Sequence, residues 1–287
     1  MKGIVVAGGL GSRLYPVTAV FSKHLLPIYD KPMIYYPLSV LMLANIREIL
    51  IICTQNDLPL YKNLLGDGSR FGISLTYMVQ EKPAGIPQAL IIGEKFIGKD
   101  TVCMILGDNI FYGHDFSTYL QDASQLKDGA LTFGYQVKDP SRFGVINFDN
   151  QGNVIEIEEK PSKPKSNIAV TGLYFYDNDC VNISKTLKPS KRGELEITDL
   201  NKTYLRENKL DCKILGRGFS WLDTGTHESL LLASQFVQII EERTGTKIAC
   251  LEEIALNNKW ISMSEIRRNN KDFVSGNYYN YLKELTK

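Results

Sequence analysis

Residues 3–13 read GIVVAGGLGSR, an apolar run that passes directly into closely spaced glycines. The run from Gly3 to Ala7 predicts a buried strand, because it is short, apolar and rich in β-branched residues. Glycines after a strand allow a sharp turn and bring backbone N–H groups close to an anion. The stretch therefore predicts a first strand that ends in a loop able to receive phosphate oxygens.

The following segments repeat this alternation of strand and helix. Further buried strands are expected at 48–54, 74–80 and 101–108, and helical spacing of apolar residues at 37–45, 57–67 and 86–96. This order favours an α/β fold with a mostly parallel sheet flanked by helices. Added antiparallel strands are expected at 129–137, 144–149, 154–159 and 169–177. Helical patterns return at 196–208 and 227–243, and short helices are expected at the C-terminal end.

Composition excludes several classes of function. The 287 residues are 44% hydrophobic and 23% charged, as in soluble globular enzymes, and a formal net charge of +1 gives no general attraction to nucleic acid or anionic membranes. The five cysteines form no CxxC pair, which argues against a zinc site or disulfide framework and predicts a reducing, cytoplasmic setting. No apolar stretch is long enough to predict a membrane-spanning helix.

Cationic side chains follow the glycine loop. Ser12 adds a hydroxyl donor and Arg13 a planar cation suited to phosphate, although the loop matches neither a P-loop nor a dinucleotide fingerprint. Lys23 lies on the next apolar turn, which ends at Pro27, and from there it can be aimed into the same cleft. The alternatives are a tight turn without a ligand and a solvated surface lysine.

Two carboxylates each end an apolar run. Asp108 closes the strand expected at 101–108, and Asp223 closes a run just before a helix. Ligands bind beyond the carboxyl ends of strands in open α/β sheets, and Mg²⁺ takes one or two carboxylates plus phosphate oxygens. Turn or helix capping is the alternative for both. The metal motif of glycosyltransferases is matched in spelling by Asp177 and Asp179, but their position at a strand-to-helix junction favours capping.

A second pair of charged residues, Glu159 and Lys160, ends another expected strand. A carboxylate can bind sugar hydroxyls and the lysine can meet a phosphate, whereas the alternative is an ordinary charged strand end. The three histidines have no ligand spacing, and no Ser–His–Asp arrangement can be argued from them.

Taken together, these segments resemble the sugar nucleotidyltransferases. The run 29–39, YDKPMIYYPLS, narrows the resemblance to glucose-1-phosphate thymidylyltransferases. The other matching segments fall in family order along essentially the whole chain: 7–14, 22–27, 106–109, 158–161, 165–167, 192–199 and 221–227. The resemblance implies transfer of a nucleotidyl group from dTTP to α-D-glucose 1-phosphate, by in-line attack on the α-phosphorus, which yields dTDP-glucose and pyrophosphate for dTDP-rhamnose and polysaccharide biosynthesis.

The resemblance also implies an architecture. A single domain over 1–287 would have a Rossmann-like nucleotide-binding core at about 1–110. An antiparallel sugar-phosphate-binding part would occupy about 111–225, and a helical C-terminal part about 226–287.

The implied catalytic residues are Arg13, Lys23, Asp108, Lys160 and Asp223, with Mg²⁺ held by the two aspartates. Nucleotide contacts are implied at Gly8, Gly9, Gly11, Ser12, Arg13, Lys23, His24, Gln80, Pro83 and Gly85. Contacts to the sugar phosphate, or to substrate beside it, are implied at Asp108, Asn109, Phe143, Gly144, Glu159, Lys160, Val170 and Trp221.

The chain departs from the family pattern in three places. Ser12 replaces a usual threonine, which keeps the hydroxyl, and His24 replaces a glutamine near the triphosphate. Residues 81–88 read EKPAGIPQ where the family usually has PSPDGLAQ, so base recognition is the least fixed part of the assignment. UTP or another hexose 1-phosphate remains an alternative. So do a glycosyltransferase and a regulator that binds nucleotide sugars without catalysis.

The resemblance further implies a homotetramer with a second nucleotide-binding site between subunits. Positions associated with that site are matched by Gly113, His114, Arg217 and Gly218. The apolar run 33–36 and the helix at 38–44 are more apolar than one buried face needs, and Tyr278, Tyr279 and Tyr281 add aromatics expected at the surface. We expect these segments at a subunit interface, with core packing as the alternative. No nucleic-acid or membrane partner is expected.

Overall fold

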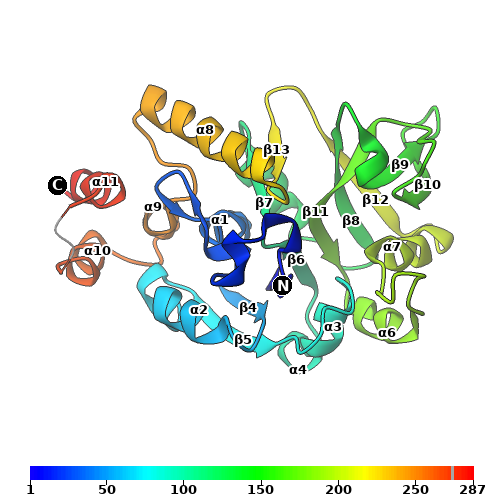
Figure 1. Ribbon diagram of the computed structural model, residues 1–287, viewed down its shortest axis with the longest axis horizontal. Helices are drawn as coiled ribbons and strands as arrows, with labels where there is room; N and C mark the ends of the chain where they lie inside the picture. Colours follow the sequence, from blue (N-terminus) through cyan, green and yellow to red (C-terminus); the bar gives the residue numbers. More distant parts are fainter. Residues whose placement is uncertain (273–274) are drawn as a thin grey trace.

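The computed structural model describes residues 1–272 and 275–287 (Figure 1). In these residues nine strands form one sheet, in the order β10-β9-β11-β6-β1-β4-β5, with β8 paired to β11 and β12 paired to β8. Its strands are β1 (Lys2–Ala7), β4 (Glu48–Cys53), β5 (Ser74–Val79), β6 (Val102–Leu106), β8 (Ala130–Gln136), β9 (Gly144–Phe148), β10 (Val154–Glu159), β11 (Ile168–Tyr176) and β12 (Leu210–Leu215).

The first half of the sheet is parallel, which confirms the expectation. β1 pairs in parallel with β4 on one side and with β6 on the other, so that Val5 lies between Ile51 and Ile105. Ile4 and Val5, although adjacent in sequence, belong to separate hydrophobic clusters. A strand buried on both faces reads as a continuous apolar run, which is why 3–7 lacks alternation.

The second half adds the expected antiparallel strands. β11 pairs antiparallel with β6, with β8 and with β9, and β10 pairs antiparallel with β9. β12 then pairs in parallel with β8, an element that the sequence patterns did not single out. In Figure 1 this half forms a lobe beside the parallel strands.

Helices cover both faces of the sheet. Residues of α1, α5 and α9 join one hydrophobic cluster, and residues of α3, α4, α6 and α7 join the other. None of the helices in the described part of the chain is long and apolar enough to cross a membrane. The α-helices are α1 (Tyr35–Leu43), α2 (Leu58–Leu65), α3 (Gln88–Ile92), α4 (Glu94–Ile97), α5 (Phe116–Ala123), α6 (Asp179–Thr186), α7 (Ile197–Arg206), α8 (His227–Thr244), α9 (Leu251–Asn257), α10 (Met263–Asn269) and α11 (Asn277–Leu285). The short 3₁₀ helices are η1 (Ser12–Leu14), η2 (Val17–Ala19), η3 (Lys23–Leu25), η4 (Ser69–Phe71) and η5 (Pro140–Arg142).

Two short ribbons complete the fold. β2 (Pro27–Ile28) pairs with β3 (Lys31–Pro32), and β7 (Asn109–Tyr112) pairs antiparallel with β13 (Ser220–Asp223). The register of the second ribbon places Asp223 opposite Asn109. It therefore brings Asp223 beside the end of β6, where Asp108 lies.

The apolar run 33–36 is part of the core of this chain, so the expectation that it lies at a subunit interface is corrected. Met33 and Ile34 are fully buried, and so is nearly all of Tyr36. Helix α1 is likewise covered, since its residues pack against β1, β6, β7, α5 and α9. Its excess of apolar residues is explained by burial on several sides at once.

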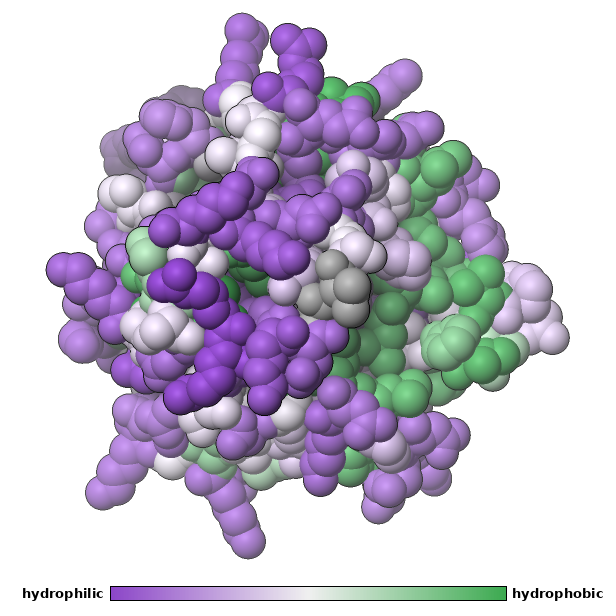
Figure 2. All heavy atoms as spheres, turned by 90° about the vertical axis from the view of Figure 1, so that its left-hand side faces the viewer, coloured by the Kyte–Doolittle hydropathy of each residue, from purple (hydrophilic) through white to green (hydrophobic). Residues whose placement is uncertain are grey.

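The C-terminal tyrosines are partly covered as well. Tyr278 packs edge-to-face on Tyr35 and donates a hydrogen bond of 2.5 Å to Glu252. Figure 2 views the end of the molecule formed by α10 and α11, where the side chains are mainly hydrophilic and hydrophobic ones gather at the right of the view. Tyr278, Tyr279 and Tyr281 are each half-buried, so they do not form the fully exposed aromatic surface that the sequence predicted.

A buried cluster of four charges joins the β2–β3 ribbon to the end of α8. Lys31 Nζ lies 2.7 Å from Glu241 Oε1 and 2.6 Å from Asp30 Oδ1. Lys247 Nζ lies 2.6 Å from Glu241 Oε2 and also contacts Asp30. Two positive and two negative charges thus compensate each other where little water reaches them, since their side chains are at most 10% exposed.

Glu241→Ala is expected to lower the free energy of unfolding by about 3–5 kcal/mol, because removing one partner leaves buried lysine charge uncompensated. The measurement is urea denaturation followed by circular dichroism. Glu242→Ala is the control, since Glu242 is exposed and accepts a hydrogen bond from Gln238 at the surface, and its effect should stay below about 0.5 kcal/mol. Equal losses in the two variants would contradict a stabilising role for the cluster.

Candidate active site

A cavity of 810 Å³ opens at the junction of the parallel half and the antiparallel lobe. The glycine loop, the end of β6, the end of β13 and the lobe strands all contribute side chains to it. Its lining includes Ser12, Arg13, Asp108, Asn109, Phe143, Gly144, Glu159, Lys160, Val170, Trp221 and Asp223, each of which the sequence had singled out.

The glycine loop runs from β1 into the short helix η1. A Cβ on Gly8 would lie 2.4 Å from Gln80 Oε1, so a side chain at this position would collide with Gln80. Gly11 adopts a left-handed conformation with φ of 62°, which suits glycine. The close approach and the turn explain why the loop needs glycines, and they leave its backbone free of side chains.

Arg13 lies across the cavity mouth from the β13 end. It is exposed, and a Cβ on Gly225 would lie 2.9 Å from Arg13 Nη2. The guanidinium therefore reaches the segment that follows Asp223. An exposed cation that lines a cavity between two loops is available to an anionic ligand.

Lys23 lies outside the cavity lining and forms an ion pair with Asp108, which belongs to the lining. Lys23 Nζ donates to Asp108 Oδ2, and Asn109 Nδ2 donates to Asp108 Oδ1 at 3.0 Å. Burial disfavours the charged carboxylate, but the Lys23 charge and these hydrogen bonds outweigh burial and hold the pKa of Asp108 at about 2. Asp108 is therefore a fixed negative charge and does not cap a turn.

Asp223 differs from Asp108 in its surroundings. Burial and then the nearby charge of Asp108 raise its pKa, against the attraction of Lys23 and Arg13. Its carboxylate accepts no hydrogen bond from the described residues. The cap of α8 is Thr226, whose hydroxyl accepts from the Ser229 N–H, so the capping alternative for Asp223 is wrong.

Asn109 ties three elements together. Its Oδ1 accepts from Trp221 Nε1 at 2.6 Å and from the Gly172 N–H at 3.0 Å, while its Nδ2 holds Asp108. One amide thus connects β7 to β13 and β11. This arrangement fixes the direction of the Asp108 carboxylate.

The far side of the cavity is built by the lobe. Lys160 Nζ lies 3.2 Å from Glu159 Oε1, and Thr198 donates to Glu159 Oε2 at 2.5 Å. The ring of Phe143 packs on that of Trp221 with centroids 5.1 Å apart. A carboxylate, an ammonium group and an aromatic wall therefore face one compartment, which suits a polyol that carries a phosphate.

Some predicted residues lie outside the cavity lining. Gln80 donates to Gln88 Oε1 at 2.6 Å beside Gly8, and Gly85 has φ of 105° and packs against the backbone of Leu195. Pro83 lies in the same connection, between β5 and α3. Ile86, which follows Gly85 in this connection, does line the cavity. Gly9 is an exposed residue of the loop, next to Lys23.

His24 occupies a position that the sequence did not indicate. Its side chain is buried beneath the loop, with Nδ1 3.1 Å from Ser22 Oγ, and Ser22 Oγ lies 3.0 Å from Tyr61 Oη. Burial, followed by the Lys23 charge, lowers its pKa to about 3. The ring is thus a neutral part of the packing under the loop, and this placement corrects the expected contact between His24 and substrate.

Several lining residues were missed. Arg142 adjoins Phe143 and lowers the pKa of Asp223, although burial acts on that group more strongly. Arg192 makes its shortest ion pair with Glu196, at 2.7 Å. Arg142 ends the short helix η5 and Arg192 lies in a turn, and in a sequence a charge in such a connection looks like a solvated charge. The other lining residues that were not predicted are Ile86, Leu106, Ser141, Gly172, Tyr174, Glu194, Ile197, Thr198 and Asn201.

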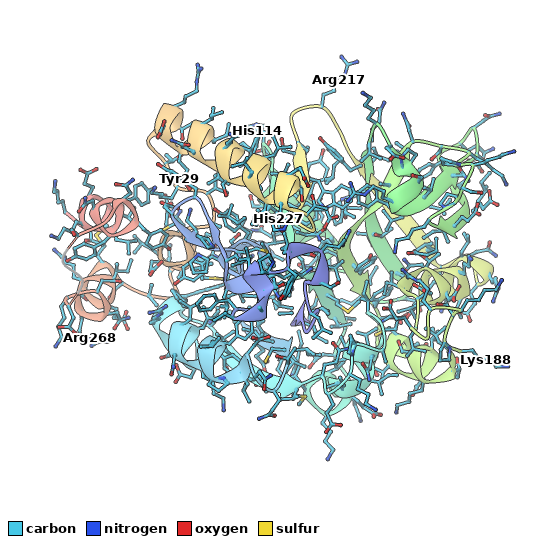
Figure 3. The ribbon with its side chains drawn as sticks, in the orientation of Figure 1. Tyr29, His114, Lys188, Arg217, His227 and Arg268 are labelled. Carbon is cyan, nitrogen blue, oxygen red and sulfur yellow. The ribbon has the colours of Figure 1, made fainter. Side chains whose placement is uncertain are left out.

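The residues associated with a second site lie together, away from the cavity lining. The β7–β13 register continues outward, so that Gly113 meets Phe219, whose ring lies within 2.1 Å of a Cβ built at Gly113. Figure 3 shows Arg217 projecting outward from the loop between β12 and β13, with His114 in the same upper part of the view. Both side chains are exposed, and Gly218 follows Arg217 shortly before β13 begins.

Comparisons with known proteins agree with this geometry. A family model described as nucleotidyl transferase matches residues 2–239. The chain is 57% identical to a glucose-1-phosphate thymidylyltransferase of Neisseria meningitidis serogroup A, over the whole of both chains. It is 52% identical to a protein of the same name from Xanthomonas campestris, over all of this chain and 97% of the relative.

Solved structures give the same picture. A crystal structure from Bacillus anthracis, described as a glucose-1-phosphate thymidylyltransferase in complex with sucrose, is 47% identical with a TM-score of 0.77, over 82% of this chain and 94% of that chain. A UDP-glucose pyrophosphorylase complexed with UDP-glucose is 25% identical with a TM-score of 0.74, over 83% of this chain and 98% of that chain. The architecture around the cavity is therefore common to proteins named for nucleotidyl transfer.

Proposed function

This chain belongs to the nucleotidyl transferase family, among the glucose-1-phosphate thymidylyltransferases, and we propose that it joins dTTP to α-D-glucose 1-phosphate, releasing pyrophosphate. The observation that carries the proposal is the single cavity that joins the glycine loop to the Glu159–Lys160 pair, with Asp108 and Asp223 between them. Each end of the cavity suits one phosphorylated substrate.

The reaction follows from these groups. An oxygen of the sugar phosphate attacks the α-phosphorus of dTTP, the P–O bond to the β-phosphate breaks, and pyrophosphate leaves with the electron pair. The nucleophile is already anionic, so no general base is required. Catalysis then consists of positioning and charge stabilisation, with Arg13 and Lys23 near the triphosphate and Lys160 on the sugar phosphate.

The donor set fits Mg²⁺. Burial and then the charge of Asp108 raise the pKa of Asp223, so a cation between the two carboxylates would be favourable, and Mg²⁺ prefers such oxygens. Among the described residues no group of three or more His, Cys, Asp or Glu side chains could hold a metal, so phosphate oxygens would complete the coordination. When bound, the cation would neutralise negative charge on the reacting phosphates.

We assign the substrate groups as follows. Gln80 and the backbone near Pro83 and Gly85 would contact the base, beside Gly8 of the loop. Glu159, with the backbone of Gly144 and Val170, would bind the sugar hydroxyls. Within one domain, about 1–110 would bind the nucleotide, about 111–225 the sugar phosphate, and the helices of about 226–287 would complete the core.

The strongest alternative keeps the chemistry and changes a substrate. We expect the highest kcat/KM with dTTP and glucose 1-phosphate. The relatives that are 47–57% identical are named glucose-1-phosphate thymidylyltransferases, whereas the UDP-glucose pyrophosphorylase is only 25% identical. The measurement is pyrophosphate release from dTTP, UTP, ATP and GTP with several hexose 1-phosphates. A preference for UTP would replace the base assignment and leave the mechanism intact.

Two more distant alternatives are not favoured. A regulator without catalysis would be expected to have lost Arg13, Asp108 or Asp223, and all three line the cavity. A glycosyltransferase would need the Asp177–Asp179 pair at its metal, but Asp177 accepts hydrogen bonds from Tyr204 and from the Gly129 N–H. Those contacts occupy Asp177 in the structure of the lobe.

We propose a homotetramer whose outer apolar residues pair at subunit contacts. The exposed side of α8 carries Leu231 and Leu232, each 60% exposed, and Ile239, 56% exposed. These side chains replace the buried run 33–36 as the best candidates for an interface. Light scattering that shows a monomer at working concentration would remove this assembly.

We further propose that a downstream dTDP-sugar binds near Gly113, His114, Arg217 and Gly218. Arg217→Ala is expected to weaken inhibition by dTDP-rhamnose without changing kcat, because Arg217 is remote from the cavity lining. Substrate must then weaken inhibitor binding by the same factor as the inhibitor weakens substrate binding. Steady-state inhibition patterns check this, and purely competitive inhibition that is unchanged in Arg217→Ala would exclude the second site.

A further inference from the structure

The contact between Lys23 and Asp108 raises a question about how a cation reaches its site. Lys23 Nζ donates directly to Asp108 Oδ2, and the side chains are only 13% and 12% exposed. Asp108 Oδ1 is engaged by Asn109 Nδ2. Both oxygens of the carboxylate are thus satisfied by groups of the protein.

An ammonium group on that oxygen opposes the binding of a divalent cation to the same carboxylate. Mg²⁺ binds oxygens at about 2.0–2.1 Å, closer than a hydrogen-bonded nitrogen, and the two positive charges would repel each other across that distance. Asp223 receives no hydrogen bond from the described residues and would be open to the cation. Lys23, and not Asn109, is therefore the group that a cation must displace from Asp108.

The ammonium group of Lys23 can also reach a second position, along the glycine loop. A Cβ built on Gly9 would lie 3.7 Å from Lys23 Cε and 3.9 Å from Nζ, and one on Gly11 would lie 3.5 Å from Cδ. The lysine therefore runs along the glycine loop before it reaches Asp108. A triphosphate on that loop offers its ammonium group another anion within a side-chain rotation.

We propose that Lys23 holds the cation position on Asp108 in the free enzyme and moves to the phosphates when nucleotide binds. The inference rests on the proposed function, since it takes the loop as the triphosphate site. A divalent cation alone then binds weakly, because it must separate a buried ion pair. Nucleotide and cation bind with positive coupling, since each removes Lys23 from the path of the other.

The test measures binding of Mn²⁺ alone, without nucleotide, by the loss of its free electron paramagnetic resonance signal. Lys23→Met removes the ammonium group and keeps a similar length, so this variant should bind Mn²⁺ at least about tenfold more tightly than the wild type, a size common for coupled sites. Adding Asp108→Asn to Lys23→Met should abolish the gain. A change below twofold in Lys23→Met would overturn the proposal.

Lys160→Met is the matched control. It removes a positive charge from the cavity that Asp108 and Asp223 line, but its ammonium group pairs with Glu159 and contacts neither aspartate. A gain of equal size in Lys160→Met would mean that general charge, and not displacement, controls Mn²⁺ binding, and would also overturn the proposal. Circular dichroism checks folding, and Lys23→Gln replaces Lys23→Met in the same measurement if the latter does not fold.

Pyrophosphate release by the wild-type preparation separates the two levels of inference. Activity with dTTP and glucose 1-phosphate, combined with unchanged Mn²⁺ binding in Lys23→Met, would overturn the lysine exchange alone. No activity with any nucleotide would overturn the proposed function, whatever the Mn²⁺ result.

Discussion

Asp108→Asn is expected to lower kcat by about 10³-fold or more at saturating Mg²⁺, on the scale that charge stabilisation of transferred phosphates reaches. The substitution keeps the shape of the side chain and removes its charge. It thus removes a cation ligand and the partner of Lys23 together. The measurement is steady-state pyrophosphate release over a range of Mg²⁺ concentrations.

The control for this variant is Asp128→Asn. Asp128 is exposed and paired with Lys209 at 2.8 Å, far from the cavity lining, so its loss should leave kcat unchanged. Near-normal turnover of Asp108→Asn at high Mg²⁺ would remove the metal assignment. Rescue by Mn²⁺, with a raised metal requirement, would support it.

Arg13→Ala is expected to lose about 10³-fold or more in kcat, the scale of arginines that serve transferred phosphates. Arg13 lines the cavity, is exposed, and no hydrogen bond within the described residues holds its guanidinium. Its removal should therefore leave the melting temperature almost unchanged. Kinetics and thermal unfolding together separate a catalytic loss from a folding defect.

Arg243→Ala provides the comparison, because Arg243 is an exposed arginine in the last turn of α8. It should behave like the wild type in both measurements. A loss of tenfold or less in Arg13→Ala would return the glycine loop to the simpler interpretation of a strand-to-helix turn.

The parallel half of the fold could be predicted because its signals are local. The run 3–7 is buried on both faces and is therefore continuously apolar, and the glycines after it mark the turn. Asp108 could be found for the same reason, since it directly follows a buried strand. In each case neighbouring residues carry the information.

The relation between Asp108 and Asp223 is not local. It depends on the pairing of β7 with β13, two short strands far apart in sequence. Before the structure, only the family resemblance indicated that these two carboxylates belong to one site. Arg142 and Arg192 were not predicted as site residues for a similar reason, since only the folded structure shows that the segments carrying them face the cavity. An apolar segment at a subunit interface and an apolar segment in the core have the same composition. The sequence therefore assigned the run 33–36 to an interface, although it is buried in the core.

The buried charge cluster bears on how the chain folds as it is made. Lys31 and Glu241 are 210 residues apart, and at about 5–20 residues per second a ribosome needs about 10–40 s to pass from one to the other. Until then Lys31 has no Glu241 or Lys247 beside it, and α1 lacks its cover from α9. The N-terminal segment therefore stays partly open until residue 241 and α9 have been synthesised, and a ribosome stalled before residue 241 would hold a chain whose first helix still exposes apolar surface to chaperones.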